Sequence, residues 1–163
     1  MDVQPDDLYP SNKVVSDHVP FYIAAKSPML YAVTKGHLDY HGGADPLVFL
    51  GVSIGAIIDS GLIWCVSDAN AATNYVRFTR NLIGLGDFVD FNLLCQRMWS
   101  KTPDDPYRPG RRAAEVLVLD RVPLELISDV IAKTQVTLHV ARTALGSVGG
   151  SRHYQVEPMF YYD

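Results

Sequence analysis

The sequence predicts an α+β domain with a mixed β-sheet core and flanking helices. Hydrophobic residues make up 48% of the 163 residues and charged residues 20%, which is typical of a globular core. Short apolar runs rich in β-branched and aromatic residues alternate with segments that carry helix-capping signals. No repeat or inner linker divides the chain. We therefore expect a single domain over residues 1–163, with residues 1–16 as an irregular N-terminal arm.

Apolar runs bounded by turn residues predict the buried strands. In chain order they are VPFYIAA (19–25), PLVFLGV (46–52), LIWCV (62–66), AAEVLVL (113–119), the second part of VPLELISDVIAK (122–133) and RHYQVEP (152–158). The first part of VPLELISDVIAK predicts one helical turn. The order of the strands in the sheet does not follow from the sequence.

Helices are predicted between these strands from capping residues and apolar spacing. In KSPMLYAVTKG (26–36), Ser27 is the expected N-cap, Pro28 suits the first turn and Gly36 ends the helix. After Ser67 or Asp68, apolar residues recur at helical spacing. The remaining predicted helices are SIGAIIDSG (53–61), SDANAATNYVRFTRNLIG (67–84), DFVDFNLLCQRMW (87–99) and TLHVARTALG (137–146).

Charge and cysteine content exclude several classes of protein. The formal net charge is −4, so a contact with nucleic acid requires a local basic patch. Cys65 and Cys95 lie in apolar segments, which predicts buried thiols in a reduced, cytoplasmic protein rather than a disulfide scaffold. The acidic, proline-containing N-terminus is no signal peptide, and no apolar run is long enough to span a membrane.

The most informative stretch is RPGRRAAEVLVLDRV (108–122), where Glu115 interrupts an apolar run. Burial raises the pKa of a carboxyl group unless a cation or a hydrogen-bond donor compensates. One interpretation is an acid that turns outward on an edge strand or pairs with an arginine. The other is a catalytic carboxylate that binds a ribose hydroxyl or takes a proton.

Three arginines, Arg108, Arg111 and Arg112, precede this acid in a predicted loop with Pro109 and Gly110. They form either a solvated basic turn or a phosphate-binding patch, because guanidinium groups match phosphate oxygens. A basic loop beside an acid at a strand mouth would draw an anionic polymer toward the carboxylate. The loop over 100–110 has a length at which loops are often functional.

Other residue types give weaker signals. His37 and His41 lie in a glycine-rich loop without a metal-binding pattern, so we expect surface or turn roles and no metal. No phosphate-binding or dinucleotide-binding glycine motif and no nucleophile elbow is present. Spacing alone assigns Tyr22 and Met29 to the core.

Taken together, the segments resemble the DarT family of DNA ADP-ribosyltransferases, and its actinobacterial members most of all. The matching stretches run in the family's order from residue 17 onward. They are DHVPFYIAAKSPMLY (17–31), PLVFLGV (46–52), WCVSDANAATNYVRF (64–78), the run that ends at Trp99, RRAAEVLV (111–118), VPLELI (122–127) and VEPMFYY (156–162).

The resemblance implies an ADP-ribosyltransferase-like fold and an NAD-dependent transfer of ADP-ribose to a base in single-stranded DNA. It implies that Glu115 is the catalytic acid and that residues 100–112 form the substrate-recognition loop. It also implies a toxin of a toxin–antitoxin system with a macrodomain antitoxin as partner. The further site residues implied are Tyr22 and Lys26 toward NAD, and Met29, Arg108, Arg111 and Arg112 toward DNA.

Three departures from the family pattern are visible. Family members carry a longer N-terminal segment that supplies a histidine and an arginine to the NAD site, and MDVQPDDLYPSNK contains neither element. Lys26 stands where the family has arginine, and Asn70 where it more often has histidine. We therefore expect an incomplete NAD pocket in these residues. The alternative function is an inactive or truncated relative that binds single-stranded DNA or a partner without transfer.

Overall fold

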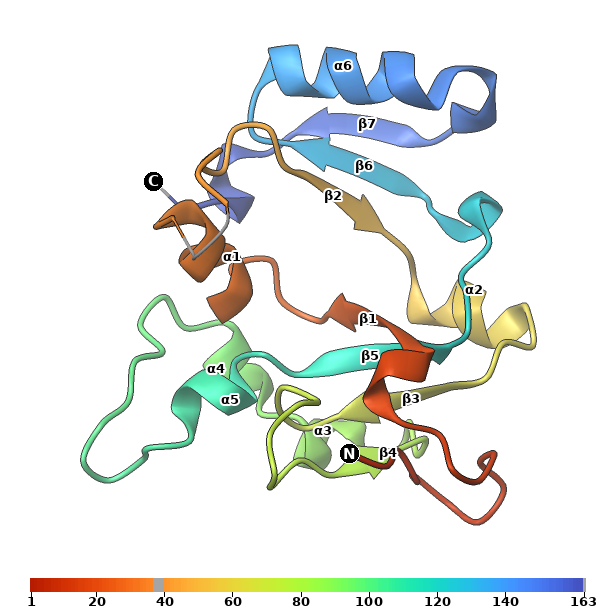
Figure 1. Ribbon diagram of the computed structural model, residues 1–163, viewed down its shortest axis with the longest axis vertical. Helices are drawn as coiled ribbons and strands as arrows, with labels where there is room; N and C mark the ends of the chain where they lie inside the picture. Colours follow the sequence, from red (N-terminus) through yellow and green to blue (C-terminus); the bar gives the residue numbers. More distant parts are fainter. Residues whose placement is uncertain (37–39, 163) are drawn as a thin grey trace. The chain divides into compact units, whose positions relative to one another are not determined.

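The computed structural model describes residues 1–36 and 40–162. These residues gather into two compact units. The first contains Met1–Ser27 and Ile58–Val122, and the second contains Pro28–Ile57 and Pro123–Asp163. Each unit has its own β-sheet (Figure 1). The predicted combination of sheets and helices is therefore present in both.

The first unit is built on a four-stranded antiparallel sheet with the order β1-β5-β3-β4. β5 lies between β1 and β3, so both of its edges are hydrogen bonded. Its side chains are almost all buried, which agrees with the apolar run that predicted it. The strands are β1 (His18–Tyr22), β3 (Trp64–Ser67), β4 (Phe78–Thr79) and β5 (Glu115–Leu119).

The N-terminal arm packs against this sheet although it forms neither helix nor strand. Val3 and Tyr9 are 0% and 3% exposed and form a core cluster with Cys65 and Leu117. The arm is closed by an isolated bridge between Asp2 and Val14, followed by the 3-10 turn η1 (Val15–Asp17). It therefore contributes apolar side chains to the core of the first unit.

A hydrogen-bonded chain fixes the arm to β1. The Nδ1 atom of His18 lies 2.8 Å from the Val14 carbonyl oxygen, which can only accept, so Nδ1 carries the proton. The Nε2 atom then accepts a hydrogen bond from the Tyr9 hydroxyl at 2.7 Å.

Burial is the main cause that raises the pKa of the Cys65 thiol to about 12, so Cys65 is an inert core thiol.

Two helical predictions for the first unit need correction. Residues 67–84 form the end of β3, turns and β4 instead of a helix, because Ser67 and Asp68 bond to loop atoms rather than cap a helix. The helix expected at 87–99 is two short ones, α3 (Leu85–Phe88) and α4 (Phe91–Leu94). Asp90 separates them and caps α4 by accepting from Leu93 N–H at 2.9 Å.

The basic segment before Glu115 also differs from the prediction. Residues Arg108–Arg111 form the one-turn helix α5 rather than a loop, and β5 begins at Glu115 rather than at residue 113. Proline in the first turn of α5 is compatible with this helix, since a helix N-terminus needs no N–H donor there. Arg108 and Arg111 therefore lie on a helix, and Arg112 directly follows it.

The second unit contains a three-stranded sheet of order β2-β6-β7, in which β2 pairs antiparallel and β7 parallel with β6. The helix α6 (Gln135–Leu145) runs along this sheet (Figure 1) and packs Leu138 against Val130 and Ala132. The other elements are β2 (Val48–Gly51), β6 (Asp129–Ala132), β7 (His153–Val156), α1 (Pro28–Thr34), η2 (Leu124–Leu126), η3 (Gly146–Gly149) and η4 (Pro158–Phe160). These include the predicted turn and strand of 122–133 and the predicted closing strand, and α6 is the helix expected between them.

Helix ends marked by glycine agree with the prediction. Gly36 and Gly61 have φ angles of 80° and 75°, which favour glycine, after α1 and after α2 (Ile54–Asp59) respectively. Two expectations about burial are wrong. Met29 is 53% exposed at the start of α1 rather than in the core, and Cys95 is exposed because its helix α4 ends there.

Three further findings concern the histidines, clusters of metal ligands and membrane-spanning helices. His41 is exposed, as expected, whereas His37 lies outside the described residues. Within residues 1–36 and 40–162, no cluster of three or more potential metal ligands occurs. No helix in that part of the chain is long and apolar enough to cross a lipid bilayer.

Candidate active site

The carboxylate of Glu115 is buried at the first residue of the central strand β5. Glu115 is 5% exposed, and its cross-strand neighbour in β1 is Tyr22. Because β5 is paired on both edges, the interpretation of an outward acid on an edge strand is wrong. A buried carboxylate at a strand end is a group whose environment can be tuned for chemistry.

A backbone donor holds this carboxylate in place. The N–H of Ala71 donates to Glu115 Oε2 at 2.9 Å. Burial raises the pKa of the Glu115 carboxyl above its ordinary value, and the hydrogen bond from Ala71 acts in the opposite direction. One carboxylate oxygen therefore has a fixed partner, and the carboxyl group takes up a proton more readily than an exposed glutamate.

The loop that supplies Ala71 is held by two polar residues at the end of β3. The Ser67 hydroxyl accepts from Glu115 N–H at 3.0 Å and lies 2.7 Å from the Ala69 carbonyl oxygen, to which it donates. Asp68 binds Arg77 through both the backbone N–H, at 2.8 Å, and Nε, at 2.7 Å. These contacts close residues 68–77 into a loop from which the N–H of Ala71 reaches Glu115.

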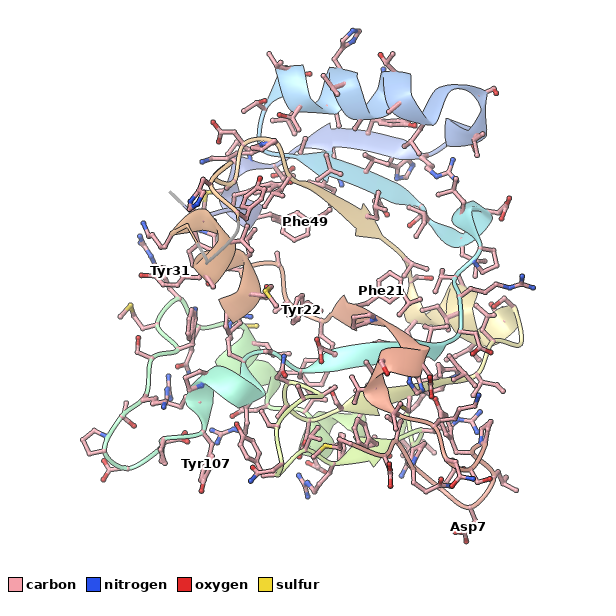
Figure 2. All side chains as sticks on the ribbon, in the orientation of Figure 1. Asp7, Phe21, Tyr22, Tyr31, Phe49 and Tyr107 are labelled. Carbon is pink, nitrogen blue, oxygen red and sulfur yellow. The ribbon has the colours of Figure 1, made fainter. Side chains whose placement is uncertain are left out.

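Tyr22 is the aromatic residue nearest to Glu115 in the sheet register, and Figure 2 shows it at the end of β1. Burial and then the negative charge of Glu115 raise the pKa of Tyr22 to about 12, so its hydroxyl remains a hydrogen-bond donor at neutral pH. Lys26 follows β1 in the same unit and is half-buried. Met29 belongs to the second unit.

The arginines of α5 are engaged with neighbouring segments of the first unit. Arg108 Nη2 donates to Gln96 Oε1 at 2.7 Å and to the Met98 carbonyl oxygen at 2.9 Å. Arg111 donates to the two carboxylate oxygens of Asp105 at 3.0 and 2.7 Å. The two arginines thus fasten the segment 96–107, which overlaps the substrate-recognition loop predicted at 100–112 and which we call the recognition loop.

Arg111 also lies 3.4 Å from Asp90 Oδ2, so two aspartates share its charge. Its hydrogen bonds are the first cause that lowers the pKa of Asp105, which stays ionised at neutral pH. Arg112, by contrast, is only 4% exposed. The three arginines are therefore not one exposed basic surface, because each has a different environment.

A cavity of about 590 Å³ lies beside these residues without reaching Glu115. Three carboxylates and two guanidinium groups line it, so its charge does not favour a phosphate. The guanidinium of Arg77 lies over the Phe88 ring, 5.2 Å from the centroid. The lining residues are Asp68, Arg77, Gly86, Asp87, Phe88, Val89, Asp90, Phe91, Asn92 and Arg111.

Several residues of the site region have no signal in the sequence pattern. Ala71 acts through its backbone N–H, which any residue except proline provides. Asn70 and Gly110 are joined by a hydrogen bond from Asn70 N–H to the Gly110 carbonyl oxygen at 2.9 Å, which ties loop 68–77 to α5. The matching block WCVSDANAATNYVRF indicated this region, but its residues were assigned to a helix.

Comparison with protein families gives a match over almost the whole chain. Residues 3–162 match the DarT family, described as ssDNA thymidine ADP-ribosyltransferase. A DNA ADP-ribosyl transferase of Mycobacterium tuberculosis is 57% identical over 160 residues, which are 98% of this chain and 69% of that relative. This similarity agrees with the predicted resemblance to actinobacterial members.

Solved structures agree with the sequence comparison. DarT of Thermus sp. 2.9 in complex with NAD+ has a TM-score of 0.82 and 27% identity, over 91% of this chain and 74% of that chain. The same protein in complex with ADP-ribosylated ssDNA has a TM-score of 0.85 and 28% identity, over 99% and 74%. The predicted α+β, ADP-ribosyltransferase-like fold is therefore confirmed, and the chain belongs to the DarT family of single-stranded DNA thymidine ADP-ribosyltransferases.

Proposed function

We propose that this protein transfers ADP-ribose from NAD to a thymidine base in single-stranded DNA, with Glu115 as the catalytic residue. The observation that carries the proposal is the buried Glu115 carboxylate, fixed by Ala71 N–H at 2.9 Å beside Tyr22. Family membership supplies the substrate classes. The family match covers both compact units, so we treat residues 1–163 as one functional domain.

The reaction breaks the bond between nicotinamide and the ribose of NAD, and nicotinamide leaves with the bonding electron pair. The ribose carbon becomes cationic and then bonds to a nitrogen of the base, which loses its proton. Glu115 stabilises the cationic sugar as an anion, and its carboxylate can accept that proton. An unpaired base can approach such a buried acid more readily than a base stacked in a duplex.

Other residues fit supporting roles within this proposal. Tyr22 and Lys26 are the proposed contacts to NAD, and the protonated Tyr22 hydroxyl can donate to a sugar or phosphate oxygen. Met29, Arg108 and Arg111 are the proposed contacts to DNA. Arg112 was also predicted to contact DNA, but it is buried, so we propose that it acts on the strand only through its positive charge beneath the surface. No metal takes part in this scheme, since the carboxylate and the leaving group suffice.

The family resemblance supports a proposal for the cellular role. We propose a cytoplasmic toxin that blocks replication by modifying DNA, with a macrodomain antitoxin that removes ADP-ribose as its partner. Expression of the active chain alone should then slow growth. The Glu115→Gln variant, expressed to the same level, should not.

The direct test is incubation of the protein with NAD and short single-stranded oligonucleotides, followed by mass spectrometry of the DNA. We expect a mass gain of one ADP-ribose on oligonucleotides that contain thymidine. Oligonucleotides without thymidine serve as the matched control and should remain unchanged. Binding without any mass gain would instead support the alternative, an inactive relative that only binds DNA.

The proposed DNA contact of Arg111 has its own test, because Asp105 and Asp90 compete with a phosphate for its guanidinium. We expect Arg111→Ala to weaken oligonucleotide binding and to reduce the slope of log K against log salt by about 0.7, the value for one phosphate contact on a single strand. Asp105→Asn releases part of the charge and should steepen that slope. Fluorescence anisotropy at several salt concentrations measures both.

If neither variant changes the salt slope, Arg111 is not a phosphate contact and its role is to hold the recognition loop. Arg111→Lys separates the two roles further. Lysine keeps the charge but loses the two-pronged bond to Asp105, so a phosphate contact should survive this change better than the loop anchor.

A further inference from the structure

Two exposed tyrosines stand together beside the proposed active site. Tyr75, from loop 68–77, is 39% exposed, and Tyr107, the last residue of the recognition loop, is 54% exposed. Their rings form an edge-to-face pair with centroids 4.8 Å apart. Figure 2 shows Tyr107 extending outward just before α5. An exposed pair of aromatic rings offers apolar surface to a ligand, so it is a candidate binding surface.

The backbone of α5 is shaped to hold this pair. A Cβ atom at Gly110 would lie 1.9 Å from the Tyr75 hydroxyl oxygen, so Tyr75 occupies the space that a side chain there would need. The N–H of Arg111 donates to the Tyr107 carbonyl oxygen at 3.1 Å, which fixes Tyr107 to the first turn of α5. Both rings are therefore positioned from the same short helix.

The pair is continuous with the catalytic residues. Gly110, which Tyr75 contacts, accepts a hydrogen bond from Asn70 N–H, and the next residue, Ala71, donates to Glu115. The recognition loop, which ends at Tyr107, also carries two exposed cations, Arg97 and Lys101. The acid Asp105 of that loop is neutralised by Arg111, which leaves Asp104 as the opposing charge. Aromatic rings among cations are the pattern of surfaces that bind single strands.

We propose that Tyr75 and Tyr107 form a stacking platform for an unpaired base next to the target thymidine. This inference rests on the proposed transfer to single-stranded DNA and adds a subsite to it. The ring of Tyr107 stacks on the flanking base, Tyr75 supports that ring from the edge, and Arg97 and Lys101 face the phosphates. Stacking does not depend on hydrogen bonds to base edges, so the platform holds the strand without selecting one base.

The first measurement is the affinity for a labelled oligonucleotide with one thymidine, by fluorescence anisotropy. Tyr107→Ala should weaken binding about tenfold, as expected for the loss of one stacked base. Tyr107→Phe keeps the ring and should restore wild-type affinity. Leu8→Ala removes a side chain that is 88% exposed elsewhere in the first unit and should leave affinity unchanged.

The second measurement replaces single bases by abasic sites on each side of the thymidine. At one position the abasic site should weaken wild-type binding about tenfold and should have no effect on Tyr107→Ala. Such a loss of additivity identifies the base on the platform. If the two losses add at every position, or if Tyr107→Ala binds as tightly as the wild type, the platform does not exist. If Tyr107→Ala binds weakly but no abasic site weakens wild-type binding, no base stacks on the rings and the platform is likewise refuted.

Transfer measured in the same samples separates this inference from the proposed function. A wild-type protein that binds the strand but transfers nothing overturns the proposed function, while the abasic scan still decides on the platform. A wild-type protein that transfers, with an unchanged KM for the oligonucleotide in Tyr107→Ala, overturns the platform alone. We expect a raised KM with nearly unchanged kcat, because the ring does not touch the reacting atoms.

Discussion

Glu115→Gln should reduce the rate of ADP-ribose transfer by at least about 100-fold, the loss typical when one stabilising group is removed from a transition state. Glutamine has the same shape and can still accept the hydrogen bond from Ala71 N–H. It lacks the negative charge that a cationic sugar needs. The measurement is single-turnover transfer to a thymidine oligonucleotide, followed by mass spectrometry.

Affinity for the oligonucleotide is the internal control for this variant. We expect it to change little, because the carboxylate is buried and stabilises the transition state more than the bound strand. A variant that transfers at the wild-type rate would refute the catalytic assignment of Glu115. The glutamine amide is far less basic than a carboxylate, so it cannot replace Glu115 as the proton acceptor.

The wild-type enzyme should also lose activity in mildly acidic solution. Transfer requires the ionised form of Glu115, and burial raises the pKa of this group above its ordinary value. The acid limb of the pH–rate profile should therefore lie above the ordinary range of glutamate. In the residual activity of Glu115→Gln this limb should be absent.

The same shift in pKa sets the sign of the effect on stability. The folded chain binds the Glu115 proton more tightly than the unfolded chain, so the free energy of unfolding falls as the pH rises through the folded-state pKa. Glu115→Gln does not ionise and escapes this loss. The difference in melting temperature, variant minus wild type, should therefore grow with pH, as thermal unfolding at several pH values would measure.

Gly110→Ala should destabilise the protein by about 1–3 kcal/mol, the usual cost of overpacking. A change from glycine to alanine inside a helix normally stabilises by roughly 0.5–1 kcal/mol, so the expected sign is reversed. The reason is the Tyr75 hydroxyl oxygen, 1.9 Å from the new Cβ atom. Tyr75 can move away only by giving up its contact with Tyr107.

Tyr75→Phe provides the matched background for this test, because it removes the hydroxyl and leaves the ring. In that background the nearest ring atom of residue 75, Cζ, lies 3.0 Å from the Cβ position, so Gly110→Ala should cost much less. Urea unfolding of the four proteins gives the coupling energy. Equal costs in both backgrounds would show that Tyr75 does not fill the space over Gly110.

The strands were predictable because their apolar runs are short and bounded by turn residues. The loop that replaces the helix expected at 67–84 was not predictable, because the same apolar spacing occurs in helices and in looped segments. What decides between them is the long-range bonding of Ser67 to Glu115 and of Asp68 to Arg77, which a periodic pattern does not contain. Tertiary contacts overrode local propensity here.

The site shows the same division. Glu115 could be found from the sequence, since an acid inside an apolar run is conspicuous. The roles of the arginines could not, because their partners Gln96, Asp90 and Asp105 are distant or lie in a loop without pattern. Three arginines in one short segment suggested an open basic surface. In the structure, Arg108 and Arg111 instead hold the recognition loop in place. The need for glycine at position 110 could not be read from the sequence, because it arises only from the position of the Tyr75 side chain.

Because Glu115 lies on β5, the residues near it differ in how well they tolerate substitution. Leu117 and Val118 in the same strand are 0% exposed, so most substitutions there unfold the first unit before they alter the chemistry. The segments around the carboxylate, loop 68–77 and the recognition loop, carry exposed side chains on anchored ends. A substitution in either loop should therefore cost less stability than one in β5, so these loops can vary without loss of the fold.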